Sequence, residues 1–430
     1  MKYYSLNKIS PVVDFKEATI AGQAPDKGLY FPEFIPRVNE DLIKNIEQYS
    51  NEEIAYEVIK PYVVDTIPEE ELRRIAAETV NFEIPLVQVS ENIFSLELFH
   101  GPTLAFKDVG ARFMSRCLGY FARDKKEKIT VLVATSGDTG GAVANGFYDV
   151  EGINVVILYP SGKVSSVQEK QLTTLGKNIH ALEVSGTFDD CQQMVKQAFA
   201  DEELKKKLFL TSANSINVAR WLPQQFYYFF LWKQWKNKEN PPVVSVPSGN
   251  FGNICAGILA QQSGLPIKEF IAACNANDVV PDYFATGKYQ PKKAVATISN
   301  AMDVGDPSNF VRILEMFDSE KNALEKIVSS DSISDAETEN TILKVLSDHN
   351  YLLDPHGAVA YAALEKQLNG DQKGVILETA HSVKFYDVIE PIINKPVEIP
   401  ESVAEQMKLE KASTKIEANA KELKSFLLSL

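Results

Sequence analysis

Along most of this chain, short runs of consecutive apolar residues alternate with longer segments in which apolar positions recur at helical spacing. A continuous apolar run predicts a strand buried on both faces, and strands interleaved with helices predict a parallel sheet with right-handed crossovers. The predicted strand and helix pairs are 93–99 and 111–124, 129–135 and 140–150, 153–160 and 165–176, and 243–248 and 254–264. The predicted class is therefore α/β, with parallel twisted sheets flanked by helices, and ligands in such folds bind at the carboxyl ends of strands.

Residues 1–80 have a different pattern, with short apolar runs around two amphipathic segments. Residues 39–50 and 68–80 each predict a helix that begins with acidic side chains, which favour the positive end of a helix. This stretch is predicted to form a small N-terminal α+β region that caps the rest of the chain.

The composition excludes several classes of partner. The chain has 430 residues, of which 45% are apolar and 24% charged, so it can form more than one unit with a substantial core. The formal net charge is −14, and a surface of that sign repels polyanions at long range. We therefore expect no nucleic acid and no membrane as a partner, and any phosphate that binds must be held by a local group of donors.

Targeting and metal-binding signals are missing from the sequence. The N-terminal residues lack the apolar core of a secretion signal, and the densest aromatic run, FYYFFLW at 226–232, is too short to span a bilayer. We therefore expect a cytoplasmic protein. The four cysteines are widely scattered and no histidines have metal-ligand spacing, so neither a disulfide framework nor a metal site is predicted.

The turn TSGDTGGA, residues 135–142, follows a predicted strand and opens a predicted helix, so its backbone N–H groups could surround an anion. Its spacing is not that of a dinucleotide motif, no lysine follows at the P-loop interval, and the next strand ends in Tyr159 and Pro160 instead of an acidic ribose ligand. The alternative is a tight turn in which glycine supplies a positive φ. From this segment alone the two interpretations are equally good.

Three further segments place polar groups at strand ends or helix starts. PSGNFGN at 247–253 repeats the strand–turn–helix arrangement and suits a small phosphate dianion. NSINVAR at 214–220 is either an ordinary helix start with a solvated Arg220 or a second phosphate site in which Arg220 supplies a fork of donors. Thr379 sits at the end of a predicted strand, where its hydroxyl faces a ligand or its β-branched side chain packs into the core.

Lys107 stands behind a Gly-Pro turn in LELFHGPTLAFKDVGARFM, residues 96–114, at the predicted first turn of a helix. The unpaired backbone N–H groups of a first turn already make the local field positive, so a lysine there is unexpected. A surface ion pair with the adjacent Asp108 is one explanation.

Several of these segments, in the same order, closely resemble the threonine synthase family, pyridoxal-phosphate enzymes of the tryptophan-synthase-β-like fold (fold type II), in its bacterial and fungal branch. The resemblance covers essentially the whole chain. It is carried by FHGPTLAFKD (99–108), ATSGDTGGA (134–142), NSINVAR (214–220), VPSGNFGN (246–253) and TAHSVKF (379–385), with further similarity in GLYFP (28–32), NAMDVGDPSNF (300–310) and DPHGAVAYAAL (354–364).

The resemblance implies pyridoxal 5′-phosphate as the cofactor and Lys107 as the catalytic residue, which forms the Schiff base and then acts as general base. A partly dry lysine at a helix start has its ammonium form disfavoured, which favours the neutral amine that attacks an aldehyde. Thr379 would offer its hydroxyl to the pyridine nitrogen. Asp138 is implied near the cofactor's 3′ oxygen; many relatives have Asn there, so the carboxyl is expected to be protonated or turned away. The cofactor phosphate would lie on Gly249, Asn250, Phe251, Gly252 and Asn253.

The resemblance further implies conversion of O-phospho-L-homoserine and water to L-threonine and phosphate, by γ-elimination and β-hydration. His356 and His381 are expected to be structural hydrogen-bonding groups. The implied substrate ligands are Thr135, Ser136, Thr139, Asn214, Ser215 and Arg220.

Three alternatives stay open. A phospho-lyase would convert phosphothreonine or phosphohomoserine to a 2-oxo acid, and a serine or threonine dehydratase would not need a second phosphate site. A non-catalytic phosphoamino-acid sensor would not need Lys107.

The implied organisation is a cap region at 1–80, a large cofactor-binding domain at 81–129 and 206–430, and a smaller mobile α/β domain at 130–205 that closes over the site. The chain could act as a monomer or a homodimer.

Overall fold

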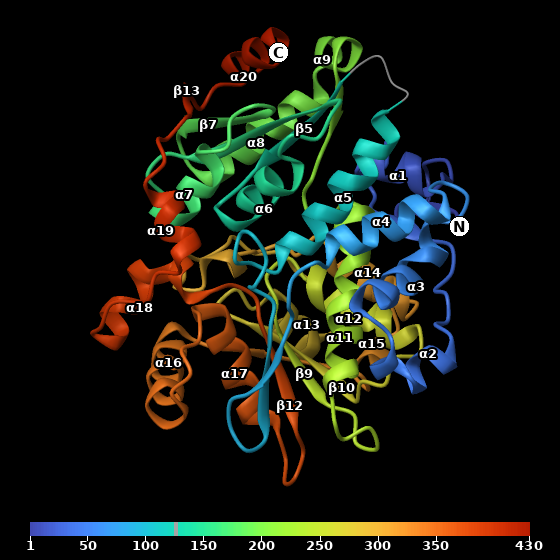
Figure 1. Cartoon of the computed structure of the whole chain (residues 1–430), viewed down its shortest axis with the longest axis vertical. Helices are drawn as coiled ribbons and strands as arrows, with labels where there is room; N and C mark the ends of the chain where they lie inside the picture. Colours follow the sequence, from blue (N-terminus) through green and yellow to red (C-terminus); the bar gives the residue numbers. More distant parts are fainter. Residues whose placement is uncertain (124–127) are drawn as a thin grey trace.

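The computed structural model describes residues 1–123 and 128–430, which form two α/β units and a small N-terminal region (Figure 1). In Figure 1 a five-stranded sheet with its helices lies in the upper part of the molecule, and a six-stranded sheet with its helices lies in the lower part. The predicted α/β class, with parallel sheets flanked by helices, is confirmed.

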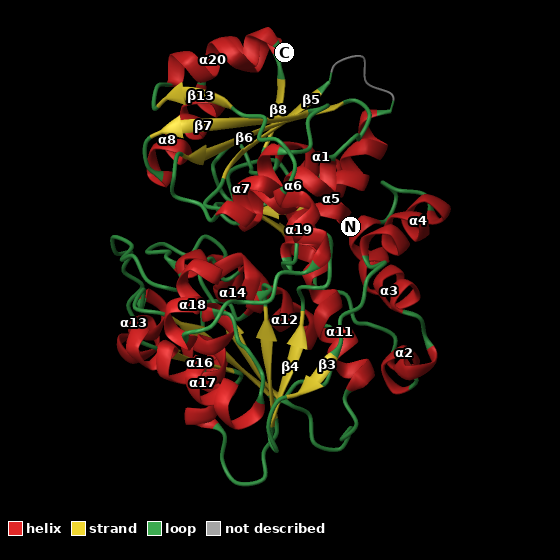
Figure 2. Ribbon diagram, turned by 60° about the vertical axis from the view of Figure 1, so that its left-hand side comes forward, coloured by secondary structure: helices red, strands yellow, loops and turns green. Residues whose placement is uncertain are grey.

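The six-stranded sheet has the order β11-β10-β9-β12-β4-β3, and its pairs are parallel except for the antiparallel edge pair of β3 with β4. Figure 2 shows its strands fanning out below the helices that separate the two sheets. The strands are β3 (Leu86–Gln88), β4 (Ile93–Glu97), β9 (Val243–Pro247), β10 (Glu269–Cys274), β11 (Val328–Ser332) and β12 (Gly374–Glu378).

Helices and single turns connect the strands of this sheet and pack around it. Helix α11 is buried on all sides from Gln225 to Trp232, which accounts for the aromatic run at 226–232. The helices are α5 (Lys107–Ala122), α10 (Val218–Trp221), α11 (Gln225–Gln234), α12 (Gly252–Gln262), α13 (Val279–Thr286), α14 (Phe310–Met316), α15 (Lys321–Leu324), α16 (Asp335–His349), α17 (Pro355–Gln367), α18 (Tyr386–Ile393) and α19 (Glu401–Met407), with single turns η2 (Leu222–Gln224), η3 (Asn300–Met302) and η4 (Ser382–Phe385).

The five-stranded sheet, in the order β13-β7-β6-β5-β8, is parallel throughout. Its central strands β5 and β6 are buried at every position, as expected for a parallel sheet covered on both faces. Its elements are β5 (Ile129–Ala134), α6 (Asp138–Phe147), β6 (Ile153–Pro160), α7 (Ser166–Thr173), β7 (Ile179–Ser185), α8 (Phe188–Ala200), α9 (Glu202–Lys207), β8 (Phe209–Thr211), β13 (Thr414–Glu417) and α20 (Ala420–Ser429).

The N-terminal region packs against the unit that contains α5. Side chains such as Tyr3, Phe15 and Tyr62 share one core cluster with Phe113 of α5 and Phe226 of α11. The region therefore supports the helix that starts at Lys107. Its elements are β1 (Tyr3–Ser5), α1 (Phe15–Ala21), β2 (Tyr30–Pro32), α2 (Glu40–Lys44), η1 (Ile46–Gln48), α3 (Asn51–Val63) and α4 (Glu69–Thr79), with β1 and β2 antiparallel.

The strand pairing differs from the predicted division of the chain in one respect. Residues 206–430 were assigned to the large domain, but β8 and β13 pair within the five-stranded sheet. Ile416 of β13 packs in the apolar cluster of this unit, and β13 pairs with the edge strand β7. Because β13 is four residues long and mostly exposed, its sequence has no clear strand pattern.

Two predicted segments also end differently. The helix predicted at 39–50 ends as α2 at Lys44 and continues as the single turn η1. The helix predicted at 111–124 is part of α5, and its last residue lies outside the described residues. None of the helices in the described part of the chain has the length and apolar character that crossing a bilayer requires.

Candidate active site

Lys107 is the first residue of α5, as predicted, and the loop before it is held in place by hydrogen bonds. The Asp108 carboxylate accepts bonds from the backbone N–H of Thr103 (2.9 Å) and from its hydroxyl (2.5 Å). The backbone N–H of Phe106 donates to the carbonyl of Thr379 at 2.9 Å, so the residue before Lys107 is tied to the end of β12. This arrangement brings Lys107 and Thr379, which are far apart in sequence, to the same place.

The Lys107 amine lies in a largely buried environment, with 19% of the side chain exposed. Burial lowers the pKa of Lys107, the nearby Asp138 carboxylate raises it in part, and the Lys384 and Arg220 cations lower it further. The Nζ atom lies 4.0 Å from Oδ2 of Asp138. The alternative of a surface ion pair with Asp108 is wrong, because Asp108 is itself buried and bonded to Thr103.

Asp138 begins α6 and is buried, and its Oδ1 atom lies 2.9 Å from the Lys384 ammonium. Gln168 also donates to this oxygen, at 3.0 Å. Burial would raise the pKa of Asp138, but Lys384 and then Lys107 bring it well below the usual range. The lowered pKa favours the ionised carboxylate, which faces two lysines. The expectation of a protonated or averted carboxyl beside the cofactor's 3′ oxygen stays a prediction.

Lys384 is the residue that sequence reasoning missed. It lies in η4, six residues after the end of β12 in the segment TAHSVKF, and its side chain is fully buried. The signal available in the sequence was a lone lysine between Val383 and Phe385, both apolar. A lysine in such a position is rarely buried without a charged partner.

The turn TSGDTGGA joins β5 to α6 as a tight turn with glycine at positive φ, and anion binding there stays a prediction. Gly137 has φ of 142°, which a side chain would strain, and no side chain caps α6. The Thr135 hydroxyl accepts from the N–H groups of Gly137 (3.0 Å) and Gly140 (2.8 Å), so it stabilises the turn. The hydroxyls of Ser136 and Thr139 have no partner among the described residues and are available to a ligand.

The turn PSGNFGN joins β9 to α12, as predicted. Phe251 is in the left-handed region with φ of 60°, and no side chain caps the first turn of α12, so its N–H groups are free for an anion. Gly249 lies against the backbone of Met302, where a Cβ atom would be 2.7 Å from a Cα atom. The Asn253 side chain accepts from Tyr228 at 2.9 Å, while its amide nitrogen has no partner in the described part of the chain.

The two loops predicted as anion sites are in direct contact. Asn250 donates from its side-chain nitrogen to the Ser215 hydroxyl at 2.6 Å, and its side-chain oxygen accepts from the N–H of Ser308 at 2.7 Å. The Asn250 side chain therefore braces the loops. The Asn214 side chain, which is partly exposed beside this contact, makes no hydrogen bond within residues 1–123 and 128–430.

Arg220, in α10, is buried against Gly110 of α5. Its Nη1 atom donates to the carbonyl of Ala213, and its Nε atom has no partner among the described residues. Burial lowers its pKa to about 10, and no described carboxylate forms an ion pair with it. A buried guanidinium without a counter-ion is suited to an anionic ligand. The helix cap in this segment is Asn217, not Asn214 or Ser215.

Thr379 and the two histidines complete the site. The Thr379 side chain is mostly buried and has no hydrogen-bond partner in the described structure. His356 contacts Asp354 at 2.5 Å and accepts from the N–H of Ala301 at 3.2 Å, and His381 accepts from the N–H of Val383 at 3.1 Å. Both imidazoles thus hold loops, in agreement with the expected structural role.

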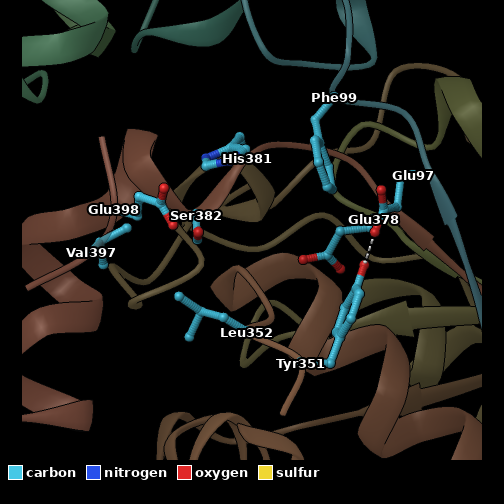
Figure 3. A pocket seen from close by; sticks show the side chains of 9 residues that line it. All are labelled: Glu97, Phe99, Tyr351, Leu352, Glu378, His381, Ser382, Val397 and Glu398. Carbon is cyan, nitrogen blue, oxygen red and sulfur yellow. Dashed lines mark hydrogen bonds between the residues drawn. The ribbon is translucent and has the colours of Figure 1, made fainter. Parts of the chain in front are cut away.

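A separate cavity of about 290 Å³ lies beside the end of β12 (Figure 3). Tyr351 donates to Glu97 at 2.8 Å on one side of it, as the dashed line in Figure 3 shows. None of the predicted site residues lines this cavity. Its lining consists of Glu97, Phe99, Tyr351, Leu352, Glu378, His381, Ser382, Val397 and Glu398.

Comparison with known proteins places the whole chain in one family. The model described as pyridoxal-phosphate dependent enzyme matches residues 82–379, threonine synthase N terminus matches 2–80, and threonine synthase, C-terminal matches 357–427. Threonine synthase from Haemophilus influenzae is 44% identical over 430 residues, covering 100% of both chains.

Solved structures agree with these matches. The crystal structure of threonine synthase from Escherichia coli has a TM-score of 0.92 and 42% identity, covering 100% of both chains. The PLP-bound threonine synthase from Brucella melitensis has a TM-score of 0.94 and 35% identity, covering 99% of this chain and 98% of that one. The resemblance stated from the sequence is confirmed. This chain therefore belongs to the threonine synthase family of pyridoxal-phosphate-dependent enzymes.

Proposed function

We propose that this protein is a threonine synthase that converts O-phospho-L-homoserine and water into L-threonine and inorganic phosphate. The observation that carries the proposal is the convergence of a desolvated lysine, Lys107, with two contacting anion-binding loops joined by the Ser215–Asn250 hydrogen bond. A cofactor phosphate and a substrate phosphate bound side by side require two such loops. The full-length similarity to proteins named threonine synthase supports the same assignment.

The free donors of this chain fit pyridoxal 5′-phosphate. Lys107 would carry the cofactor, the uncapped first turn of α12 with the loop 249–253 would bind its phosphate, and the unpaired Thr379 hydroxyl would meet the pyridine nitrogen. When bound, the cofactor supplies an electron-withdrawing ring that stabilises negative charge on the substrate carbon atoms. A hydroxyl partner in place of a carboxylate leaves that nitrogen largely unprotonated, which moderates the withdrawal.

Lys107 moves protons in this proposal. Burial favours its neutral amine, which can accept the proton from the substrate Cα. The Asp138 carboxylate, 4.0 Å from Nζ, stabilises the ammonium that results. The same amine is then positioned to return a proton to the product carbon skeleton.

The substrate phosphate would be held by the second loop. Arg220 supplies a buried cation, and Ser136, Thr139 and Asn214 supply side chains that have no partner among the described residues. Ser215 lies within this group through its contact with Asn250. Thr135 acts there through the turn that its hydroxyl stabilises. These hydrogen-bond donors and the Arg220 charge would also stabilise the phosphate as it leaves Cγ.

The proposed site is built from residues of both α/β units, so movement of one unit towards the other would exclude water from it. Asp138 and Thr139 belong to the unit of the five-stranded sheet, whereas Lys107 and Thr379 belong to the unit of the six-stranded sheet. We propose that residues 130–205, together with the strands β8 and β13 that pair with them, move as a body over the bound substrate, bringing the two groups together and keeping bulk water out.

Product analysis tests the proposal. The purified holoenzyme is incubated with O-phospho-L-homoserine, and inorganic phosphate, L-threonine and 2-oxobutanoate are measured in the same samples. We expect threonine and phosphate in equal amounts. Phosphate with 2-oxobutanoate would assign the chain to the phospho-lyases instead. Retained cofactor with no turnover of any phosphoamino acid would indicate a sensor.

A further inference from the structure

Lys384 is a buried cation beside the candidate active site that the proposed reaction does not use. Its side chain is fully buried and its Nζ atom contacts Asp138 (2.9 Å), the carbonyl of Thr103 (2.7 Å) and the Gln171 side-chain oxygen (2.9 Å). An ammonium group has three protons, so these three acceptors satisfy it completely. Lys384 therefore cannot turn to another partner without leaving a buried N–H group unpaired.

The Asp138 carboxylate is held asymmetrically as a result. Its Oδ1 atom accepts from both Lys384 and Gln168, at 2.9 and 3.0 Å. Its Oδ2 atom accepts no hydrogen bond from the described residues and lies 4.0 Å from the Lys107 amine. One oxygen is an anchor, and the other is presented to Lys107.

The charges around this pair come from four elements. Asp138 of α6 is faced by Lys384 of η4, by Lys107 of α5 and by the neutral Gln168 of α7. Lys107 is faced by Asp138, Lys384 and Arg220. Burial by itself disfavours a charged carboxylate at Asp138. Lys107 exchanges its proton during the proposed turnover and cannot supply a constant positive charge. Among the described residues this leaves Lys384 as the one cation that contacts Asp138 throughout the reaction.

We propose that Lys384 is a positioning residue for this reaction: it keeps Asp138 ionised through Oδ1 and thereby fixes Oδ2 as the acceptor that faces the Lys107 amine. The inference rests on the proposed function, in which Lys107 accepts and returns a proton. It assigns the chemical role to Asp138 and the supporting role to Lys384.

Three variants of the holoenzyme test it: Lys384→Met, Asp138→Asn, and the two combined. In Lys384→Met the buried carboxylate loses its permanent partner and is protonated at neutral pH, so kcat should fall by about 10- to 100-fold, as for a misplaced group next to the chemistry. KM should change little, because neither side chain is proposed to hold the substrate. Since Lys384 acts through Asp138, the double variant should match Asp138→Asn alone, and the two effects should not multiply.

The pH dependence separates this role from a merely structural one. In Lys384→Met, raising the pH ionises Asp138 again, so the deficit in kcat should shrink as the pH rises, whereas the deficit of Asp138→Asn should not. The absorbance spectrum of the bound cofactor should show the same additional titration in Lys384→Met and lack it in the double variant. This spectrum is read without substrate, so it stays informative even if the chain does not make threonine.

Lys411→Met is the matched control. Lys411 also binds two carboxylates, Glu169 and Glu183, but contacts neither Asp138 nor Lys107, and its loss should leave the spectrum and its pH dependence unchanged. Multiplicative effects of the two single substitutions, or a wild-type pH profile in Lys384→Met, would overturn the proposal. Unfolding of both Lys384→Met and the double variant would also overturn it, because the lysine would then serve the fold alone. If Lys384→Met unfolds and the double variant folds, the dependence of Lys384 on the Asp138 charge is supported.

Discussion

The side-chain nitrogen of Asn250 lies 2.6 Å from the hydroxyl oxygen of Ser215, across 35 residues of sequence. This bond joins the loop before α12 to the loop before α10, the two segments in which anion binding was predicted. Because the Asn250 amide is used in this contact, anions there must be bound by the N–H groups of α12 and by the free side chains of the neighbouring turns. Under the proposed function, the cofactor phosphate and the substrate phosphate would therefore lie side by side.

Replacement of Lys107 by alanine should abolish turnover, because the chain then has neither an attachment point for the cofactor nor a proton acceptor at the substrate Cα. Borohydride reduction followed by peptide mass analysis should label residue 107 in the wild type and nothing in the variant. Lys196→Ala, an exposed residue of α8, provides the control and should behave as wild type. Near-normal threonine production by Lys107→Ala would refute the assignment.

Replacement of Arg220 by alanine should weaken binding of O-phospho-L-homoserine by about 2–3 kcal/mol, since a phosphate would lose a charged donor in a buried place. Cofactor content, measured by absorbance, should stay unchanged. Arg220→Lys keeps the charge without the planar fork and should give an intermediate KM. Loss of the cofactor with an unaltered KM would mean that the two anion loops have the opposite assignment.

Arg312 should be important for stability. It is fully buried and donates to the carbonyls of Tyr30 (3.0 Å) and Ile216 (2.7 Å) and to Asn309 (2.7 Å), and it lies 4.3 Å from the Trp221 ring centroid. Arg312→Leu would leave these acceptors buried without a donor, at a cost of about 3–5 kcal/mol in the free energy of unfolding.

Thermal unfolding followed by circular dichroism checks this expectation. Arg73→Leu, at an exposed position of α4 that pairs with Glu69, should change the midpoint by no more than about 1 °C, consistent with a weak surface ion pair. An Arg312→Leu midpoint equal to that of wild type would show that the N-terminal region is not held by this residue.

Acid should weaken the attachment of β13 to its sheet. Burial would raise the pKa of Glu183, but hydrogen bonds from Lys411 and Ser161 and the nearby ammonium charges lower it to about 2. A carboxylate with a lowered folded-state pKa stabilises the protein above its unfolded pKa, near 4.5, and this contribution is lost as the pH falls towards about 2. Lys411 lies just before β13, so loss of its ion pair with Glu183 should destabilise the pairing of β13 with the sheet.

The measurement is the unfolding midpoint of wild type and Glu183→Gln at pH 7, 5, 4 and 3. The variant should be less stable at pH 7 and should lose less stability than wild type between pH 5 and pH 3. Parallel curves for the two proteins would contradict a role for this carboxylate in acid sensitivity.

The turns around the site were predictable because they need particular residues. Gly137 has a φ that only glycine adopts without strain, and Gly249 approaches the backbone of Met302 too closely for a side chain. Lys384 was not predictable, because nothing in its local sequence states that a carboxylate 246 positions earlier in the chain, Asp138, lies 2.9 Å from its ammonium. Ion pairs between distant segments leave no periodic pattern.

The sequence by itself determined the parallel α/β class, the strand-to-helix turns and the place of Lys107 at the start of a helix, since these depend on local apolar patterning and on backbone conformations that few residues adopt. Only the tertiary structure decided that β13 completes the five-stranded sheet, that Asn250 bonds to Ser215, and that Lys384 contacts Asp138. The physical reason is the range of the interactions along the sequence. Dihedral preference and burial periodicity act over a few neighbouring residues, whereas hydrogen bonds and ion pairs also join residues that are far apart in sequence once packing brings them together.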